Sequence, residues 1–260
     1  MVIDGKKIAE EILGDLKTRP RPAKFLAAVL VGDEPAMVSF VKQKEKIARV
    51  LSVDFRIRRL PENIKESDLR TEVLKVAGDK NCGGLILQLP LPENVNRGEI
   101  IKIIPPEKDI DNLSGKSSVS SPAVGVVETI IQNLKFKIQN SRVAVVGLGF
   151  LIGKPVAEWL KGKCSELYSL DSSNDLGILK QADLVISGVG KAGFIKPEIL
   201  KDGATVIDFG YDFKDGKISG DFDADSTTYN LQPITYTPTP GGTGPILVAK
   251  LFENFYKLNS

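Results

Sequence analysis

The sequence of 260 residues contains no histidine. Histidine is the side chain whose ordinary pKa lies nearest to neutral pH, and it is the most common general acid or base in enzymes. Proton transfer near neutral pH must therefore use another group. A lysine whose pKa is lowered by burial is suited to that role.

Other features that mark particular classes of protein are also scarce. Cys82 and Cys164 lack partners at metal-ligand spacing, which argues against zinc or another metal site and predicts two small core residues. The formal net charge is only +2, so no basic surface for nucleic acid is expected. No apolar segment reaches the roughly 20 residues that span a membrane, and the start of the chain does not resemble a signal peptide. We therefore expect a cytoplasmic protein that binds neither nucleic acid nor membrane.

Residues 35–50 are predicted to form a helix with one lysine on its apolar face. Pro35 suits the first turn, and Asp33 is placed to cap it. Lys42 and Lys46 point away from the apolar stripe, which consists of Met37, Phe40, Val41, Lys44, Ile47, Ala48 and Leu51. Either the stem of Lys44 packs on the core while its ammonium group reaches water, or the amine is needed for chemistry. The helix alone leaves both interpretations open.

Short apolar runs alternate with helical patterns along most of the chain, which predicts βαβ units and an α/β fold with mostly parallel sheets. Residues 105–122 are rich in Pro, Ser, Asp and Lys and are expected to connect two domains. We predict two open α/β domains that flank a ligand-binding cleft, with residues 1–120 in the first and 121–242 in the second. A last helix within residues 243–260 is expected to pack back on the first domain.

The segment "VAVVGLGFLIGKP" follows a predicted strand and opens a helix, which is typical of a dinucleotide-binding turn. Gly147 would form the tight bend, Gly149 would let the backbone approach a pyrophosphate, and Gly153 would complete the motif. Asp171 ends the next strand, where an acid accepts hydrogen bonds from the ribose of NAD and repels a 2′-phosphate. A merely structural turn and a solvated acid are the alternatives. The pattern predicts a Rossmann-like second domain.

Two later strand ends also carry glycine and are expected at the same edge of the sheet. "SGVGKAGF" contains Val189 and Gly190, and "DFGYD" contains Gly210. We expect both to lie over the nicotinamide half of a dinucleotide. Ser172 and Ser173, beside Asp171, could instead bond a 2′-phosphate, so these residues leave the choice between NAD and NADP open.

The other polar candidates lie in the first half of the chain. Gln88 ends the apolar strand in "LILQLPLPENV", where an amide can bond both an amine and a ligand. Asp109 and Asp111 lie two residues apart in "EKDIDNL" without a third hard ligand at suitable spacing, so one of them is expected to hydrogen-bond a ligand rather than a metal. A satisfied loop amide is the alternative for Gln88.

These segments occur together, and in this order, in one family that the chain resembles over nearly its whole length. "VIDGKKIA", "LQLPLP", "PPEKDID", "GATVIDFG" and "TPTPGGTGP" are similar to segments of the bifunctional methylenetetrahydrofolate dehydrogenase/methenyltetrahydrofolate cyclohydrolases. The resemblance implies an NADP-linked enzyme of one-carbon metabolism, and a homodimer. It would transfer a hydride from the methylene carbon of the folate to the nicotinamide, and then hydrolyse the methenyl product to 10-formyltetrahydrofolate.

By this resemblance, Lys44 matches the catalytic lysine, Gln88 the glutamine that bonds it, and Asp111 the acid that anchors the pterin ring. Phe40 would stack on the aminobenzoate ring. The resemblance also places Pro240 and Gly241 beside the substrate and Gly242 beside the cofactor.

The chain departs from the family pattern at several of these positions. Phe40 replaces a tyrosine, and Asn112 replaces the glycine of "DxDG". Leu148 and Asp171 stand where an arginine and a basic or serine residue help to hold the phosphate of NADP, which makes NAD an alternative cofactor. Two other functions compete: a two-domain dehydrogenase of the shikimate type, which needs neither "LQLPLP" nor "PGGTGP", and a non-catalytic paralogue.

Overall fold

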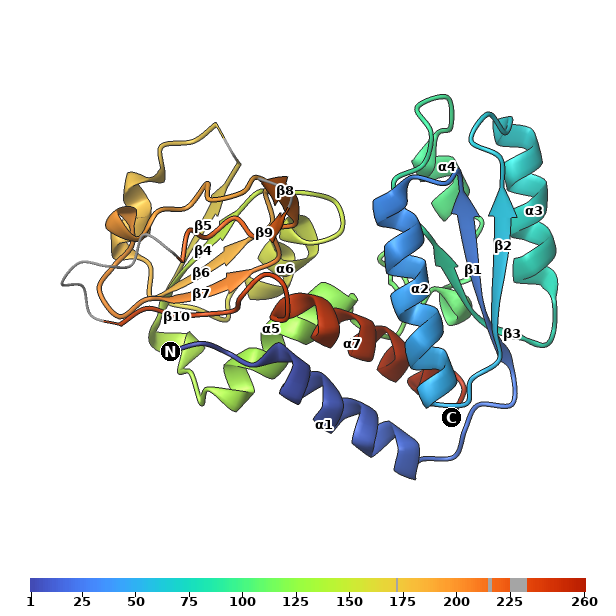
Figure 1. The fold of residues 1–260 in the computed structure, drawn as a ribbon, viewed down its shortest axis with the longest axis horizontal. Helices are drawn as coiled ribbons and strands as arrows, with labels where there is room; N and C mark the ends of the chain where they lie inside the picture. The colour runs from blue at the N-terminus through green and yellow to red at the C-terminus, as the bar shows by residue number, and fades with distance from the viewer. Residues whose placement is uncertain (172, 215–216, 225–232) are drawn as a thin grey trace. The chain divides into compact units, whose positions relative to one another are not determined.

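The computed structural model describes residues 1–171, 173–214, 217–224 and 233–260 (Figure 1). Within these residues the α/β class is confirmed. The chain divides into two compact units, one formed by Met1–Ala9 and Ala123–Leu247 and the other by Glu10–Pro122 and Val248–Ser260. No helix in the described ranges has the length and apolar character needed to cross a bilayer.

The unit that contains Lys44 is built on a parallel sheet with strand order β2-β1-β3. All seven residues of β1 are buried, as expected for the central strand of a sheet covered on both faces. Pairing of Val29 with Leu87 brings the ends of β1 and β3 together. The strands are β1 (Phe25–Val31), β2 (Phe55–Leu60) and β3 (Cys82–Leu87), and the helices are α2 (Pro35–Val50), α3 (Glu66–Gly78) and α4 (Arg97–Ile101).

The other unit contains a parallel sheet with strand order β10-β7-β6-β4-β5, and an antiparallel pair β8-β9. Because the five strands are parallel, their carboxyl ends meet at one edge of the sheet. The strands are β4 (Arg142–Val146), β5 (Glu166–Leu170), β6 (Leu184–Ser187), β7 (Thr205–Asp208), β8 (Asp212–Lys214), β9 (Lys217–Ser219) and β10 (Thr235–Tyr236). The helices are α5 (Pro122–Asn133) and α6 (Gly153–Leu160).

The first residues of the chain pair with the last strand of this second sheet. The Ile3 amide donates to Tyr236 O at 2.8 Å, and the Tyr236 amide donates to Met1 O at 2.9 Å. Residues 1–9 therefore belong with β10, which differs from the sequence-based range of 1–120 for the first domain. The helix that follows, α1 (Gly5–Thr18), is divided between the units.

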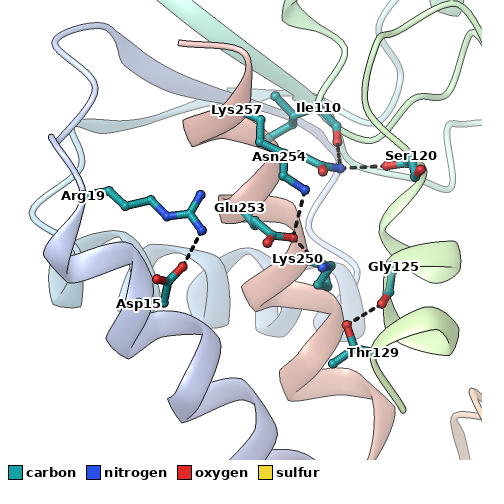
Figure 2. Close-up of polar contacts among 10 residues, drawn as sticks. All are labelled: Asp15, Arg19, Ile110, Ser120, Gly125, Thr129, Lys250, Glu253, Asn254 and Lys257. Atoms are coloured by element: carbon teal, nitrogen blue, oxygen red, sulfur yellow. Dashed lines mark hydrogen bonds and ion pairs between the residues drawn. The ribbon is translucent and has the colours of Figure 1, made fainter. Parts of the chain in front are cut away.

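The last helix, α7 (Thr243–Lys257), contributes its final residues to the Lys44 unit. Its buried Asn254 donates from Nδ2 to Ile110 O at 2.9 Å and to Ser120 O at 2.8 Å (Figure 2). One side chain thus fastens both ends of the loop that carries Asp111. On the same helix, Glu253 forms ion pairs with Lys250 and Lys257 (Figure 2).

The two cysteines differ in their surroundings. Cys82 is buried in β3, as predicted for a small core residue, whereas Cys164 is only half-buried after α6. Both are free thiols. Among the described residues, no three or more Cys, Asp or Glu side chains are grouped so that they could hold a metal ion.

Candidate active site

Helix α2 presents Lys44 on its inner face, as its apolar pattern predicts. Met37, Val41 and Ala48 are buried, Lys44 is half-buried, and Lys42 and Lys46 are exposed. The predicted cap at Asp33 is wrong, because Glu34 is the N-cap residue. Its carboxylate accepts hydrogen bonds from the Ala36 amide at 3.1 Å and the Met37 amide at 2.9 Å. The longer glutamate side chain reaches back over the first turn from the adjacent position.

The structure brings Lys44 and Gln88 into direct contact. Lys44 Nζ donates to Gln88 Oε1 at 2.9 Å, although the residues are 44 positions apart. Gln88 is buried immediately after β3, and its Nε2 donates to Leu89 O at 3.0 Å. Because Nε2 is engaged by the backbone, Oε1 faces the lysine. The amine is therefore held at the carboxyl end of β3.

Asp111 is the third member of the group with Lys44 and Gln88, because its charge interacts with that of Lys44. Burial raises the pKa of Asp111 to about 6, although the charge of Lys44 opposes this rise and the charge of Asp109 adds to it. Burial also lowers the pKa of Lys44, while Asp111 acts in the opposite direction. Both groups are thus moved toward neutral pH, the range in which proton transfer is most effective.

The two acids of "EKDIDNL" have different environments. Asp109 is fully buried, and its carboxylate accepts hydrogen bonds from the Leu113 amide at 2.9 Å and the Ser114 amide at 2.8 Å. It shapes the loop, which leaves Asp111 as the acid near Lys44. Asn112 has a φ of 50°, in the left-handed region that asparagine tolerates better than most residues. This conformation accounts for its presence where the family pattern has glycine.

Phe40 is half-buried one helical turn before Lys44 and on the same face of α2. The structure thus places Phe40, Lys44, Gln88 and Asp111 in one unit. Pro240 and Gly241, which were expected to contact the same substrate, lie in the other unit with the predicted dinucleotide-binding residues.

The dinucleotide-binding turn joins β4 to α6. Gly147 has a φ of 85°, and a Cβ there would lie 2.8 Å from Gly188 O. A Cβ at Gly153 would overlap Gly147 O, whereas a Cβ at Gly149 would have no atom within 4 Å. Helix α6 begins at Gly153 without a side-chain cap, although the Lys154 amide donates to Gly149 O at 3.0 Å and Pro155 has no N–H. The exposed Gly149 beside an uncapped helix start fits a pyrophosphate. Leu148 lies within this turn.

Asp171 follows β5 at the same edge of the sheet and is exposed. Its Oδ1 accepts hydrogen bonds from Ser173 Oγ at 2.6 Å and from the Ser173 amide at 2.8 Å. Both bonds lower the pKa of Asp171, so it carries a negative charge at neutral pH. Ser172, predicted as a phosphate ligand, lies outside the described residues.

The remaining predicted cofactor residues follow the next strands. Val189 and Gly190 come after β6, Gly210 comes after β7, and Gly242 precedes α7. Sequence reasoning missed two fully buried acids among them, Asp208 and Asp221. The signal that could have found Asp208 is an acid at the end of an apolar strand, in "TVIDFG".

Comparisons with known proteins bear directly on this arrangement. The family described as "Tetrahydrofolate dehydrogenase/cyclohydrolase, catalytic domain" matches residues 3–111, and its "NAD(P)-binding domain" matches residues 120–260. "Bifunctional protein FolD" of Halothermothrix orenii is 33% identical over 278 residues, which cover 98% of this chain and 96% of the relative. The FolD of Clostridium tetani is 31% identical over 98% of this chain and 97% of its own length.

Solved structures of the same family share the fold. The dehydrogenase-cyclohydrolase (FolD) of Trypanosoma brucei, complexed with NADP cofactor and inhibitor, has a TM-score of 0.91 at 26% identity and covers 99% of this chain, with 96% of its own chain matched. The bifunctional enzyme FolD of Campylobacter jejuni has a TM-score of 0.90 at 26% identity. The match covers 100% of this chain and 98% of the Campylobacter jejuni chain.

A shikimate 5-dehydrogenase of Thermus thermophilus reaches a TM-score of only 0.58 at 14% identity, covering 90% of this chain and 93% of its own, which shows a likeness of fold alone. The shikimate-type and non-catalytic alternatives are not favoured. The second unit is a Rossmann-like NAD(P)-binding domain. The chain therefore belongs to the tetrahydrofolate dehydrogenase/cyclohydrolase family, and it oxidises 5,10-methylenetetrahydrofolate and hydrolyses the methenyl product to 10-formyltetrahydrofolate.

Proposed function

We propose that Lys44 is the acid/base group of the cyclohydrolase reaction, positioned by Gln88. The hydrogen bond from Lys44 Nζ to Gln88 Oε1, in a chain without histidine, carries this proposal. Burial lowers the pKa of Lys44, so a larger fraction of the amine is neutral than in an exposed lysine, and the neutral amine can accept a proton. As water adds to the methenyl carbon, Lys44 takes one proton from it and gives that proton to the ring nitrogen whose bond to this carbon breaks. The second proton of the water is released to solvent as the hydroxyl becomes the formyl carbonyl, which balances the positive charge of the methenyl substrate.

Asp111 and Phe40 are proposed to hold the folate beside this lysine. An ionised Asp111 accepts hydrogen bonds from the N–H groups of the pterin ring, and Phe40 stacks on the aminobenzoate ring. Pro240 and Gly241 are proposed to contact the substrate as well. When bound, the nicotinamide of the dinucleotide accepts the hydride in the oxidation step.

The affinity for folate should depend on the ionisation of Asp111. Because the pKa of Asp111 is raised to about 6, the carboxyl gains a proton as the pH falls through 6 and loses acceptor capacity. The Kd for a tetrahydrofolate ligand, measured by fluorescence titration, should rise by about tenfold per pH unit below 6. Asp111→Asn should bind more weakly and show no such dependence, which separates the titration of Asp111 from that of the ligand. A wild-type Kd that is constant from pH 7 to pH 5 would contradict the proposal.

For the cofactor, we propose that Asp171 favours NAD over NADP. Its charge lies at the end of β5, where Rossmann-like domains meet the adenosine ribose, and Leu148 supplies no positive charge for a 2′-phosphate. The NADP complex of the Trypanosoma brucei relative supports the opposite choice. The proposed dinucleotide ligands are the turn residues Gly147, Leu148, Gly149 and Gly153 and the later residues Asp171, Ser172, Val189, Gly190, Gly210 and Gly242.

One assay tests the proposals for the cyclohydrolase reaction and for the cofactor preference. The protein is incubated with 5,10-methylenetetrahydrofolate and either NAD or NADP, while the absorbances of the methenyl product and of the reduced cofactor are followed. Asp171→Ser should shift the ratio of kcat/KM toward NADP by about tenfold or more, because an opposing charge is removed. An unmoved ratio would mean that Asp171 faces solvent in the complex.

The cytoplasmic location and the homodimer stay predictions. Sedimentation equilibrium would test the dimer.

A further inference from the structure

Asp221, in the NAD(P)-binding unit, is a fully buried carboxylate that holds the loop after β6. Its Oδ2 accepts hydrogen bonds from Ser187 Oγ at 2.6 Å and the Val189 amide at 2.7 Å, and its Oδ1 accepts one from the Lys191 amide at 2.8 Å. These donors are a hydroxyl and two backbone amides, none of them charged. Burying a carboxylate is costly, and three donors of this kind offset the cost only while the loop keeps its conformation.

Asp208 plays a similar part at the end of β7. Its carboxylate accepts hydrogen bonds from the Gly210 amide at 2.6 Å and the Phe222 amide at 2.9 Å. Its backbone bonds both ends of the 237–243 loop, because its amide donates to Thr237 Oγ1 at 2.7 Å and its carbonyl accepts from Thr243 Oγ1 at 2.8 Å. The two buried aspartates thus fasten the loops after β6 and β7, which carry the predicted nicotinamide-side residues, and the 237–243 loop, which carries Gly242.

The glycines around these acids have no room for a side chain. A Cβ at Gly210 would overlap the carboxylate of Asp221, and a Cβ at Gly220 would overlap that of Asp208. Gly210 is expected from the sequence to approach the cofactor. In the structure, glycine is needed at this position because the carboxylate of Asp221 occupies the space of a side chain. Glycine at positions 210 and 220 thus leaves the space that the two carboxylates occupy.

We infer that Asp221 is a positioning residue that fixes the 188–191 loop in the shape that receives the nicotinamide half of the dinucleotide. This inference rests on the proposed cofactor role of Val189 and Gly190. With the amides on either side of Gly190 bound to one carboxylate, Gly190 is held at the exposed tip of the loop with a φ of 74°. A loop shaped before the ligand arrives loses less freedom on binding, and it sets the orientation needed for hydride transfer.

Asp221→Asn tests the inference, because it keeps the size of the side chain. One oxygen becomes an NH₂ group, which cannot accept the hydrogen bonds that the carboxylate accepts on both sides. The Kd for NADH and for NADPH, measured by fluorescence titration, and the dinucleotide KM should rise by about 10- to 100-fold. Hydrolysis of 5,10-methenyltetrahydrofolate added directly should stay within about twofold of wild type, since that reaction needs no dinucleotide and its proposed acid/base group, Lys44, lies in the other unit.

Asp183→Asn is the matched control. Asp183 precedes the same strand, β6, at its opposite end, and its carboxylate accepts a hydrogen bond from the Arg142 amide at 2.8 Å. This variant should keep wild-type dinucleotide affinity. An equal loss in both variants would mean that general destabilisation is the cause and would overturn the inference, as would wild-type affinity in folded Asp221→Asn.

If Asp221→Asn does not fold, Ser187→Ala replaces it. This variant removes one donor and should raise the dinucleotide Kd by about three- to tenfold, and an unchanged Kd would overturn the inference. Failure of the proposed cofactor site is a separate outcome, in which Gly149→Ala, at the open glycine of the dinucleotide turn, leaves dinucleotide binding unchanged.

Discussion

Lys44→Met should lower cyclohydrolase turnover by about 10²- to 10⁴-fold, the usual cost of losing a general acid or base. Methionine keeps most of the stem that packs in α2 but removes the amine that donates to Gln88 Oε1. Dinucleotide affinity should not change, because the predicted dinucleotide ligands lie in the other unit. The measurement is the decay of methenyltetrahydrofolate absorbance at saturating substrate, together with a fluorescence titration with NADH.

Lys42 and Lys46 provide internal controls on the same helix. Both are exposed, so Lys42→Met and Lys46→Met remove equal charge without touching the buried face. Each should retain cyclohydrolase turnover within about twofold of wild type. If Lys44→Met hydrolyses the substrate as fast as these controls, the amine has no part in the reaction and only its stem matters.

The second large effect is expected at Gly153, where an added methyl group would overlap Gly147 O and approach Leu148 Cα to 2.9 Å. Gly153→Ala must displace the backbone of the dinucleotide turn. We expect the free energy of unfolding to fall by about 1–3 kcal/mol and dehydrogenase kcat/KM to fall by about 100-fold. Thermal unfolding and initial rates with NAD and NADP check the two parts separately.

Gly149→Ala separates two effects of an added methyl group: a clash with the protein backbone, as expected at Gly153, and a clash with the bound dinucleotide. Nothing lies within 4 Å of a Cβ at Gly149, so the free energy of unfolding should stay within about 0.5 kcal/mol of wild type. A methyl group there should still weaken dinucleotide binding by tenfold or more, because the pyrophosphate is expected to approach this backbone closely. Full stability of Gly153→Ala would refute the crowding argument, and full affinity of Gly149→Ala would refute the close approach.

Local patterns in the sequence predicted the elements and much of the lysine site. The apolar stripe of α2 placed Lys44 on the buried face because helical spacing alone determines which residues share a face. The choice of cap was beyond this reasoning, since Asp33 and Glu34 are adjacent acids and only the backbone geometry decides which one reaches the first amides. The contact of Lys44 with Gln88 was expected from the family resemblance, not from spacing.

The buried acid Asp221 of the NAD(P)-binding unit could not be predicted in the same way. Asp221 lies 34 residues from Ser187, its hydroxyl donor, and a polar segment around it is typical of a surface loop. Asn254 lies 144 residues from Ile110 and has no local pattern that would pair them. Such contacts depend on which distant segments the fold brings together, and periodicity within a window of the sequence does not contain that information.

The hydrogen bonds of Asn254 also determine the order in which the chain can fold as it is synthesised. Both ends of the Asp111 loop are fastened by the last helix, and Asn259 donates to Gly83 O in β3 at 2.8 Å, so residues near 254–259 hold much earlier segments of their unit in place. All the residues of the NAD(P)-binding unit have been synthesised by Leu247, whereas the Lys44 unit lacks Val248–Ser260 until those residues have been made as well. Most of the Lys44 unit, Glu10–Pro122, thus precedes the bulk of the NAD(P)-binding unit in the chain and yet is completed after it, in reverse of the usual N-terminal-first order of domain folding.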